Sequence, residues 1–200
     1  MRRFGYAFGL VALFCMFAAP ARAVYLSESN GRAYLTGSFE DGDDADFAAF
    51  LAKPREKPLK IIFLNSHGGK IRPAIAMARA LRKARLDTAV RATSTICESA
   101  CTLLFAAGIR RYNIGGDQVY EGTTALIGLG YHTAHLRGDR ARASEQSERG
   151  IDEMAKLYVE MGQPQAVRLM RLAAFNTLWR PSGQVTLAYR IATSLGEPPE

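Results

Sequence analysis

Ser99 stands where a hydroxyl nucleophile could act on a carbonyl group. It follows Cys97-Glu98, and the pattern predicts a helix over residues 98–107. A serine hydroxyl is a weak nucleophile at its own pKa, so it needs a base and hydrogen-bond donors for the developing oxyanion. The start of a helix has free backbone N–H groups, and that of Ala100 is one candidate donor. The same position also suits Ser99 as a helix N-cap.

Two glycines after a buried strand offer the second donor. Gly68 and Gly69 come after the apolar run 59–64 and the residues Asn65-Ser66-His67. Without side chains, they can bring backbone N–H groups close to a substrate carbonyl. A plain turn is the alternative interpretation of such a pair.

The base is predicted to be His132. It ends the strand-like run 125–131, so its backbone is rigidly placed, whereas His135 lies in a polar loop and His67 lies within the glycine turn. A structural role is the alternative for a histidine at a strand end. The prediction therefore depends on the serine, the glycines and the histidine together.

Two cysteines flank the candidate nucleophile. Cys97 and Cys101 are four residues apart and could pair in an oxidising compartment, which would brace the backbone that carries Ser99. A thiolate at the helix start is an alternative nucleophile, but pairing would silence both cysteines. The cysteines and histidines show no zinc-site spacing, so neither a metal nor another cofactor is predicted.

The elements that must position these residues alternate between strands and helices. Strands are predicted over 24–26, 33–39, 59–64, 88–92 and 125–131, and helices after the acidic loop 40–46 and over 73–84, 98–107, 141–161 and 165–175. We expect Asp43 or Asp44 to cap the first helix and Pro164 to be the first residue of the last helix. Residues 112–121 are expected to be irregular, and Gly150 is expected to interrupt the helix over 141–161. This order predicts an α/β protein with a mainly parallel sheet, in which function gathers at the carboxyl ends of the strands.

The N-terminus resembles a signal peptide. Arg2 and Arg3 precede the apolar stretch 4–19, and residues 21–23 read Ala-Arg-Ala, which suits signal peptidase. We expect cleavage after Ala23, a periplasmic or secreted protein, and one domain over 24–200. The stretch is short for a bilayer span, so no stable membrane span is expected after cleavage, and an uncleaved anchor is the alternative.

The charge pattern argues against nucleic-acid binding. Without residues 1–23 the chain has 23 basic and 19 acidic residues. Its basic residues recur at helical spacing, for example at Arg79, Arg82 and Lys83, with no aromatic–basic signature beside them. Solvated helix faces explain this pattern.

Three segments together resemble the ClpP serine peptidase family, and most closely its exported, single-chain relatives. They are 61–69 (Ile-Ile-Phe-Leu-Asn-Ser-His-Gly-Gly), 97–102 (Cys-Glu-Ser-Ala-Cys-Thr) and His132. The resemblance implies a ClpP/crotonase-like spiral of βαβ units with a C-terminal helical extension. It also implies a nucleophile at Ser99, a base at His132 and oxyanion-hole donors at Gly68, Gly69 and Ala100.

The chain departs from the family's pattern in three places. His67 stands where the family usually has proline, and there is an apparent insertion between Arg111 and Leu126. The family's acid would fall near 175–179, where this chain has no Asp or Glu and Asn176 is the nearest substitute. An asparagine can hold an imidazole but cannot stabilise the imidazolium as a carboxylate does, and Asp152 comes too early to match unless a new arrangement recruits it. A dyad, a triad with Asn176 and a weakened site all stay open.

The expected function is that of a periplasmic serine hydrolase, a ClpP-like peptidase acting on peptide or protein substrates. A catalytically weakened or inactive ClpP-fold binding or scaffold protein is the alternative, because the acid is missing. A crotonase-like acyl-CoA enzyme ranks last, since acyl-CoA is not an expected periplasmic substrate. The resemblance further implies a homo-oligomer assembled through the helix after His132, whereas no ATPase partner is expected outside the cytoplasm.

Overall fold

The structure is a computed structural model that describes residues 24–133, 140–173 and 177–199, with side chains left out over 140–147. A five-stranded sheet forms its centre. Its strand order is β1-β2-β3-β4-β6. β1 and β2 form an antiparallel hairpin, and all other neighbours run parallel. The strands are β1 (Val24–Ser29), β2 (Arg32–Gly37), β3 (Ile61–Asn65), β4 (Asp87–Arg91) and β6 (Arg111–Ile114).

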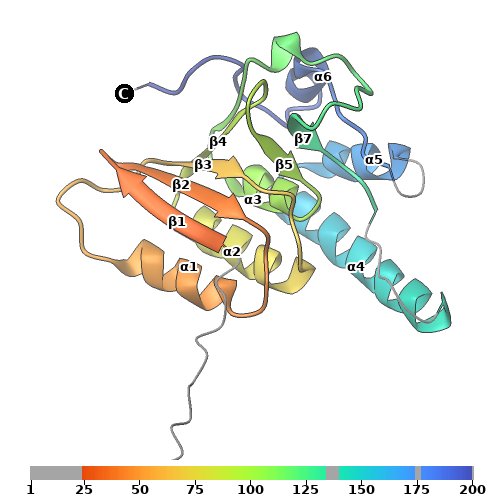
Figure 1. Cartoon of the computed structure of the whole chain (residues 1–200), viewed down its shortest axis with the longest axis horizontal. Helices are drawn as coiled ribbons and strands as arrows, with labels where there is room; N and C mark the ends of the chain where they lie inside the picture. Colours follow the sequence, from red (N-terminus) through yellow and green to blue (C-terminus); the bar gives the residue numbers. More distant parts are fainter. Residues whose placement is uncertain (1–23, 134–139, 174–176, 200) are drawn as a thin grey trace, which may run out of the picture.

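Helices cover one face of this sheet (Figure 1). They are α1 (Asp43–Ala52), α2 (Ile71–Lys83) and α3 (Cys101–Ala107), and α4 (Arg140–Glu160) and α5 (Pro164–Leu172) pack beside them. Leu35, Ile62 and Leu64 point from the strands into this core, where they meet Phe47 and Met77 of the helices. The short η1 (Gly116–Gln118) and α6 (Gly183–Ala188) contact each other near the end of the chain.

A second, two-stranded sheet lies at the carboxyl end of β3. It consists of β5 (Ile96–Glu98) and β7 (Gly128–Gly130), which run parallel. A bridge between Ser66 and Cys97 joins it to the residue that follows β3. The predicted α/β class with a mainly parallel sheet is therefore confirmed, and the candidate site falls where the two sheets meet.

The prediction of a helix over 98–107 was wrong at its start. The Glu98 N–H donates to the Ser66 carbonyl oxygen at 3.0 Å, and the Ser99 N–H donates to the Gly130 carbonyl oxygen at 2.9 Å. These bonds hold residues 96–99 in sheet pairing, so α3 begins only at Cys101. Ser99 thus lies in the sharp turn between a strand and a helix, not inside a helix.

Other predicted elements also changed. Residues 111–114, expected to be largely irregular, form β6, whose Arg111 is buried and donates to backbone carbonyl groups at Gly108 and Ile191. The strand expected over 125–131 is confined to β7, and α4 continues through Gly150. Gly42, not Asp43 or Asp44, is the N-cap of α1. The Asp43 carboxylate does not cap the helix and instead accepts a hydrogen bond from the Glu40 N–H. Pro164 begins α5 as predicted.

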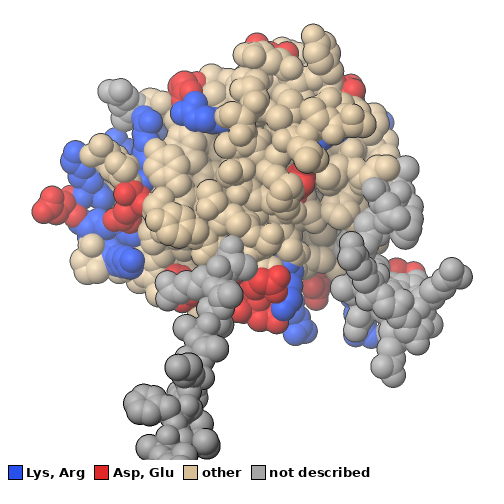
Figure 2. Space-filling view, viewed as in Figure 1, with Lys and Arg blue, Asp and Glu red and all other residues tan. Residues whose placement is uncertain are grey.

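The surface carries charges of both signs. Figure 2 shows Lys and Arg side chains mixed with Asp and Glu at the left and along the lower edge of this face, around a centre with little charge. Within residues 24–133, 140–173 and 177–199, no helix has both the length and the apolar character needed to span a membrane.

Candidate functional site

Ser99 has a strained backbone. Its φ of 53° lies in the left-handed region, which residues other than glycine rarely adopt. The Ser99 carbonyl oxygen accepts from the N–H and from Oγ1 of Thr102, at 3.0 and 2.5 Å, so both ends of the residue are held. Strain of this kind costs on the order of 1–3 kcal/mol and concentrates at active sites and ligand clamps.

A disulfide closes this strained turn. Cys97 and Cys101, which the sequence suggested could pair, are bonded, and both residues are fully buried. The bond encloses Glu98, Ser99 and Ala100. It therefore ties the first residue of α3 to β5 across the turn that carries Ser99.

The glycine turn packs directly on the Ser99 turn. Gly68 has a φ of 89°, and a Cβ added to it would stand 2.6 Å from the Glu98 carbonyl oxygen, 2.8 Å from the Ala100 nitrogen and 2.9 Å from the Ser99 Cβ. Gly69 has a φ of 137° and packs against the Phe39 backbone in a parallel bridge. Glycine is required at both positions because no side chain fits.

Two backbone donors stay open beside Ser99. The Gly68 N–H donates to Ser66 Oγ at 3.0 Å and is therefore engaged. The N–H groups of Gly69 and Ala100 have no hydrogen-bond acceptor within the part of the chain that the structure describes. Of the three donors predicted from the sequence, Gly69 and Ala100 are thus the pair available to an oxyanion.

His132 lies at the end of the strand next to Ser99. It is half-buried and follows Tyr131, which pairs antiparallel with Trp179 through hydrogen bonds of 2.9 and 2.7 Å. Because β7 also receives the Ser99 N–H, the structure brings the backbones of Ser99 and His132 to neighbouring strand ends. The pairing of Tyr131 with Trp179 brings the segment after residue 176 next to the site. Asn176 and His135 lie outside the described residues.

A histidine–carboxylate–guanidinium cluster adjoins Ser99. His67 Nδ1 lies 2.8 Å from Glu98 Oε2, and the other carboxylate oxygen of Glu98 accepts from the Arg180 guanidinium. The side chains of Glu98 and Arg180 are only 6% and 2% exposed, whereas that of His67 is 63% exposed. A carboxylate can only accept, so Nδ1 carries the proton in this contact. Sequence reasoning missed the cluster.

The sequence contained one partial signal for this cluster. Glu98 directly precedes the candidate nucleophile, and an acid beside a buried turn requires a partner. The partner, Arg180, lies 82 residues away, and only the pairing of its segment with β7 brings it there. The Ser99 turn thus brings its own carboxylate to the site, but the contacts of this carboxylate that the structure describes are with His67 and Arg180, not with His132.

Two buried tyrosines lie behind the site. Burial raises the pKa of Tyr131 well above its ordinary value, and burial also raises the pKa of Tyr158 despite the hydrogen bond to Thr102. Tyr158 Oη lies 2.6 Å from Thr102 Oγ1, the atom that also donates to the Ser99 carbonyl oxygen. Both phenols therefore stay neutral, and Tyr158 braces the turn from the core side through Thr102.

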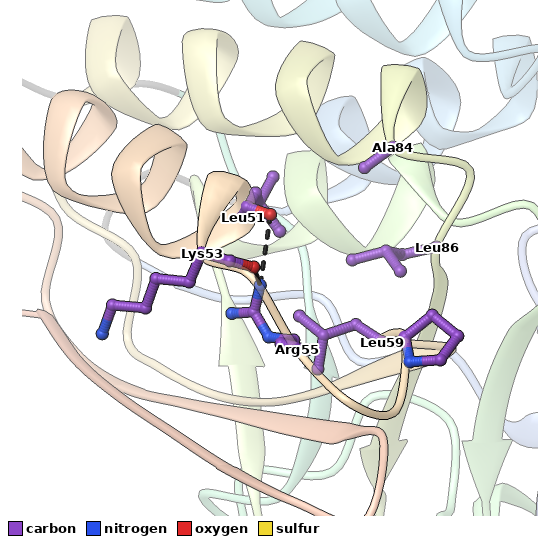
Figure 3. Close-up of a pocket in the computed structure, with 7 residues that line it drawn as sticks. Leu51, Lys53, Arg55, Leu59, Ala84 and Leu86 are labelled. Atoms are coloured by element: carbon purple, nitrogen blue, oxygen red, sulfur yellow. Dashed lines mark hydrogen bonds between the residues drawn. The ribbon is translucent and has the colours of Figure 1, made fainter.

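A pocket of about 270 Å³ lies at the opposite edge of the sheet (Figure 3). Leu59 and Leu86, which line it, precede the amino ends of β3 and β4, whereas Ser99 lies at the carboxyl ends. Arg55 is already held there by the carbonyl oxygens of Leu51 and Lys53 and by Glu28. These contacts give Arg55 a structural role.

Comparison with protein-family models finds no match, and a search of curated proteins finds no significant match. The functional interpretation therefore rests on the residues of this chain.

Proposed function

We propose that this protein is a serine hydrolase of the ClpP/crotonase type, a peptidase with Ser99 as nucleophile. The observation that carries the proposal is the left-handed backbone of Ser99, held between β5 and α3 against Gly68, with two unengaged N–H groups beside it. Such a turn presents a serine hydroxyl and its oxyanion donors from a rigid backbone.

In the proposed reaction, the Ser99 hydroxyl passes its proton to His132 and bonds to the substrate carbonyl carbon. The carbonyl electron pair moves to the oxygen, which the N–H groups of Gly69 and Ala100 hold as an oxyanion. The tetrahedral species collapses, the leaving amine takes the proton from His132, and water then releases the acyl group by the same steps. No metal or cofactor enters this scheme.

A fluorophosphonate probe tests the nucleophile. We expect the probe to label the wild-type protein at Ser99 and to leave Ser99→Ala unlabelled. Ser94→Ala, which removes an exposed serine from a nearby loop, should label at the wild-type rate. Labelling that persists in Ser99→Ala would show that another residue reacts.

A binding or scaffold protein is the second candidate. One observation favours it: the carboxylate beside Ser99 is paired with His67 and the buried Arg180. This candidate predicts an unreactive Ser99 and a peptide or protein ligand that binds equally well to Ser99→Ala. Calorimetric titration of both forms with unfolded polypeptide distinguishes the two functions.

The proposal includes export and self-assembly. A signal peptide cleaved after Ala23 would release a chain that enters β1 at once, and N-terminal sequencing of the periplasmic fraction should begin at Val24. Val159, which is exposed on α4, offers a position at which assembly through that helix can be tested. Sedimentation analysis of wild type and Val159→Glu should show an oligomer that the substitution weakens.

A further inference from the structure

The His67–Glu98–Arg180 cluster joins all the segments that form the candidate site. His67 belongs to the glycine turn, and Glu98 belongs to the turn that carries Ser99. Arg180 belongs to the segment that pairs with Tyr131, and its guanidinium also donates to the Ile127 carbonyl oxygen at 2.6 Å, just before β7. One carboxylate thus connects the oxyanion turn, the nucleophile and the strand that leads to His132.

Stability alone does not account for this cluster. Removing a carboxylate and a guanidinium from water is expensive, and apolar side chains of similar volume often stabilise a core as well or better. What such a pair provides is a fixed orientation: when a guanidinium binds one oxygen of a carboxylate, the other oxygen is held in one place. That second oxygen is the one that His67 contacts.

The glycine turn needs such a restraint. Gly68 and Gly69 both have positive φ and are conformationally free in isolation. One side of the turn is fixed by backbone bonds with Phe39 and by the bond from the Gly68 N–H to Ser66 Oγ. On the other side, a hydrogen bond between the side chains of His67 and Glu98 joins this turn to the residue next to Ser99.

We propose that His67 is a positioning residue of the Ser99 site, which acts through Glu98 and neither gains nor loses a proton in the reaction. Its Nδ1 holds the glycine turn against the Ser99 turn, so that the N–H groups of Gly69 and Ala100 keep a fixed position relative to each other. The catalytic consequence rests on the proposed hydrolase function, whereas the restraint on the two turns does not.

A matched pair of substitutions tests this role. The amide nitrogen of His67→Asn takes the place of Nδ1 and can donate to Glu98, whereas that of His67→Gln takes the place of Nε2. We expect His67→Asn to react with the fluorophosphonate probe close to the wild-type rate and with the same pH profile. We expect His67→Gln and His67→Ala to react roughly 10- to 100-fold more slowly, because small displacements of positioned groups have effects of this size.

Three labelling results would overturn the catalytic part of the inference. Equal labelling rates in all four proteins would show that the contact positions nothing that matters to Ser99. Slow labelling in His67→Asn together with the other variants, or a lost pH transition, would show that the imidazole itself transfers a proton. Thermal unfolding of each variant serves as the control, since His67 is largely exposed and its replacement should leave the fold intact.

Amide hydrogen exchange decides the restraint independently of activity. We expect faster exchange over residues 66–70 and 97–101 in His67→Gln and His67→Ala than in wild type and His67→Asn. Identical exchange in all four proteins would contradict the restraint. A wild-type protein that the probe does not label would contradict the hydrolase proposal, and the exchange measurement would still decide whether His67 holds the two turns together.

Discussion

Gly68 and Ser99 are packed so closely that a Cβ on Gly68 would stand 2.9 Å from the Ser99 Cβ. The same added atom would meet the backbone of Glu98 and Ala100, neither of which is free to move within the disulfide-closed turn. The identity of residue 68 therefore controls the shape of the nucleophile turn, although the two residues are 31 positions apart in the chain.

Gly68→Ala should lower both stability and reactivity. Gly42 is a matched control, because its φ of 96° is similar and an added Cβ there meets nothing within 4 Å. We expect Gly42→Ala to cost about 1 kcal/mol for the left-handed backbone and Gly68→Ala to cost about 1–3 kcal/mol more through overpacking. Urea unfolding measures the difference, and equal losses would contradict the close packing.

Replacement of Ser99 should separate strain from function. Ser99→Gly and Ser99→Ala both remove the hydroxyl, so neither should be labelled by the probe. Glycine tolerates a φ of 53°, so we expect Ser99→Gly to be more stable than Ser99→Ala by about 0.5–1 kcal/mol. At Ser94, which has no positive φ, the order should reverse. The same order at both positions would argue against strain at Ser99.

Loss of the Glu98 charge should be strongly destabilising. Glu98→Gln leaves the buried Arg180 guanidinium without a counter-charge, which typically costs about 3–5 kcal/mol. Glu160→Gln removes the partner of Arg79 from a solvent-exposed pair and should cost less than about 1 kcal/mol. The double variant Glu98→Gln/Arg180→Met should recover part of the loss. Similar effects of the two single variants on denaturant unfolding would contradict a buried pair.

The buried tyrosines should make the fold sensitive to alkaline pH. Burial raises the pKa of Tyr131 and Tyr158 in the folded protein, whereas both phenols ionise near pH 10 when unfolded. Their contribution to stability is complete below about pH 10 and is lost as the pH rises toward the folded-state pKa, because only the unfolded chain releases the protons. The unfolding free energy should therefore fall less steeply above pH 10 in Tyr158→Phe than in wild type. Tyr120→Phe, at an exposed position, should retain the wild-type slope.

The sequence predicted the buried strands and the glycine turn because both depend on local patterns. The apolar run ending at Leu64 is too short for a helix and indicates a buried strand, and the two glycines after it indicate a turn. The spacing of Cys97 and Cys101, together with the expected export, also indicated that the two could pair. These features place the candidate site at the carboxyl end of β3.

Contacts between distant segments were not predictable in the same way. β6 escaped detection because its buried Arg111 and Asn113 read as loop residues, although Arg111 is satisfied by carbonyl oxygens from the end of the chain. Glu98 was assigned to a helix because its pairing partners, Ser66 and Gly130, belong to other segments. The link from His67 to Arg180 depends on both of these long-range pairings, so no local pattern contained it.

The disulfide around Ser99 has a consequence for the order of events during folding. Thiol–disulfide exchange requires direct access to a sulfur atom, and both Cys97 and Cys101 are completely buried. An oxidant must therefore reach the two thiols before the core closes over them, and a reductant added later meets a protected bond. The shape of the nucleophile turn consequently records the redox conditions under which the chain folded, not those that the finished molecule encounters.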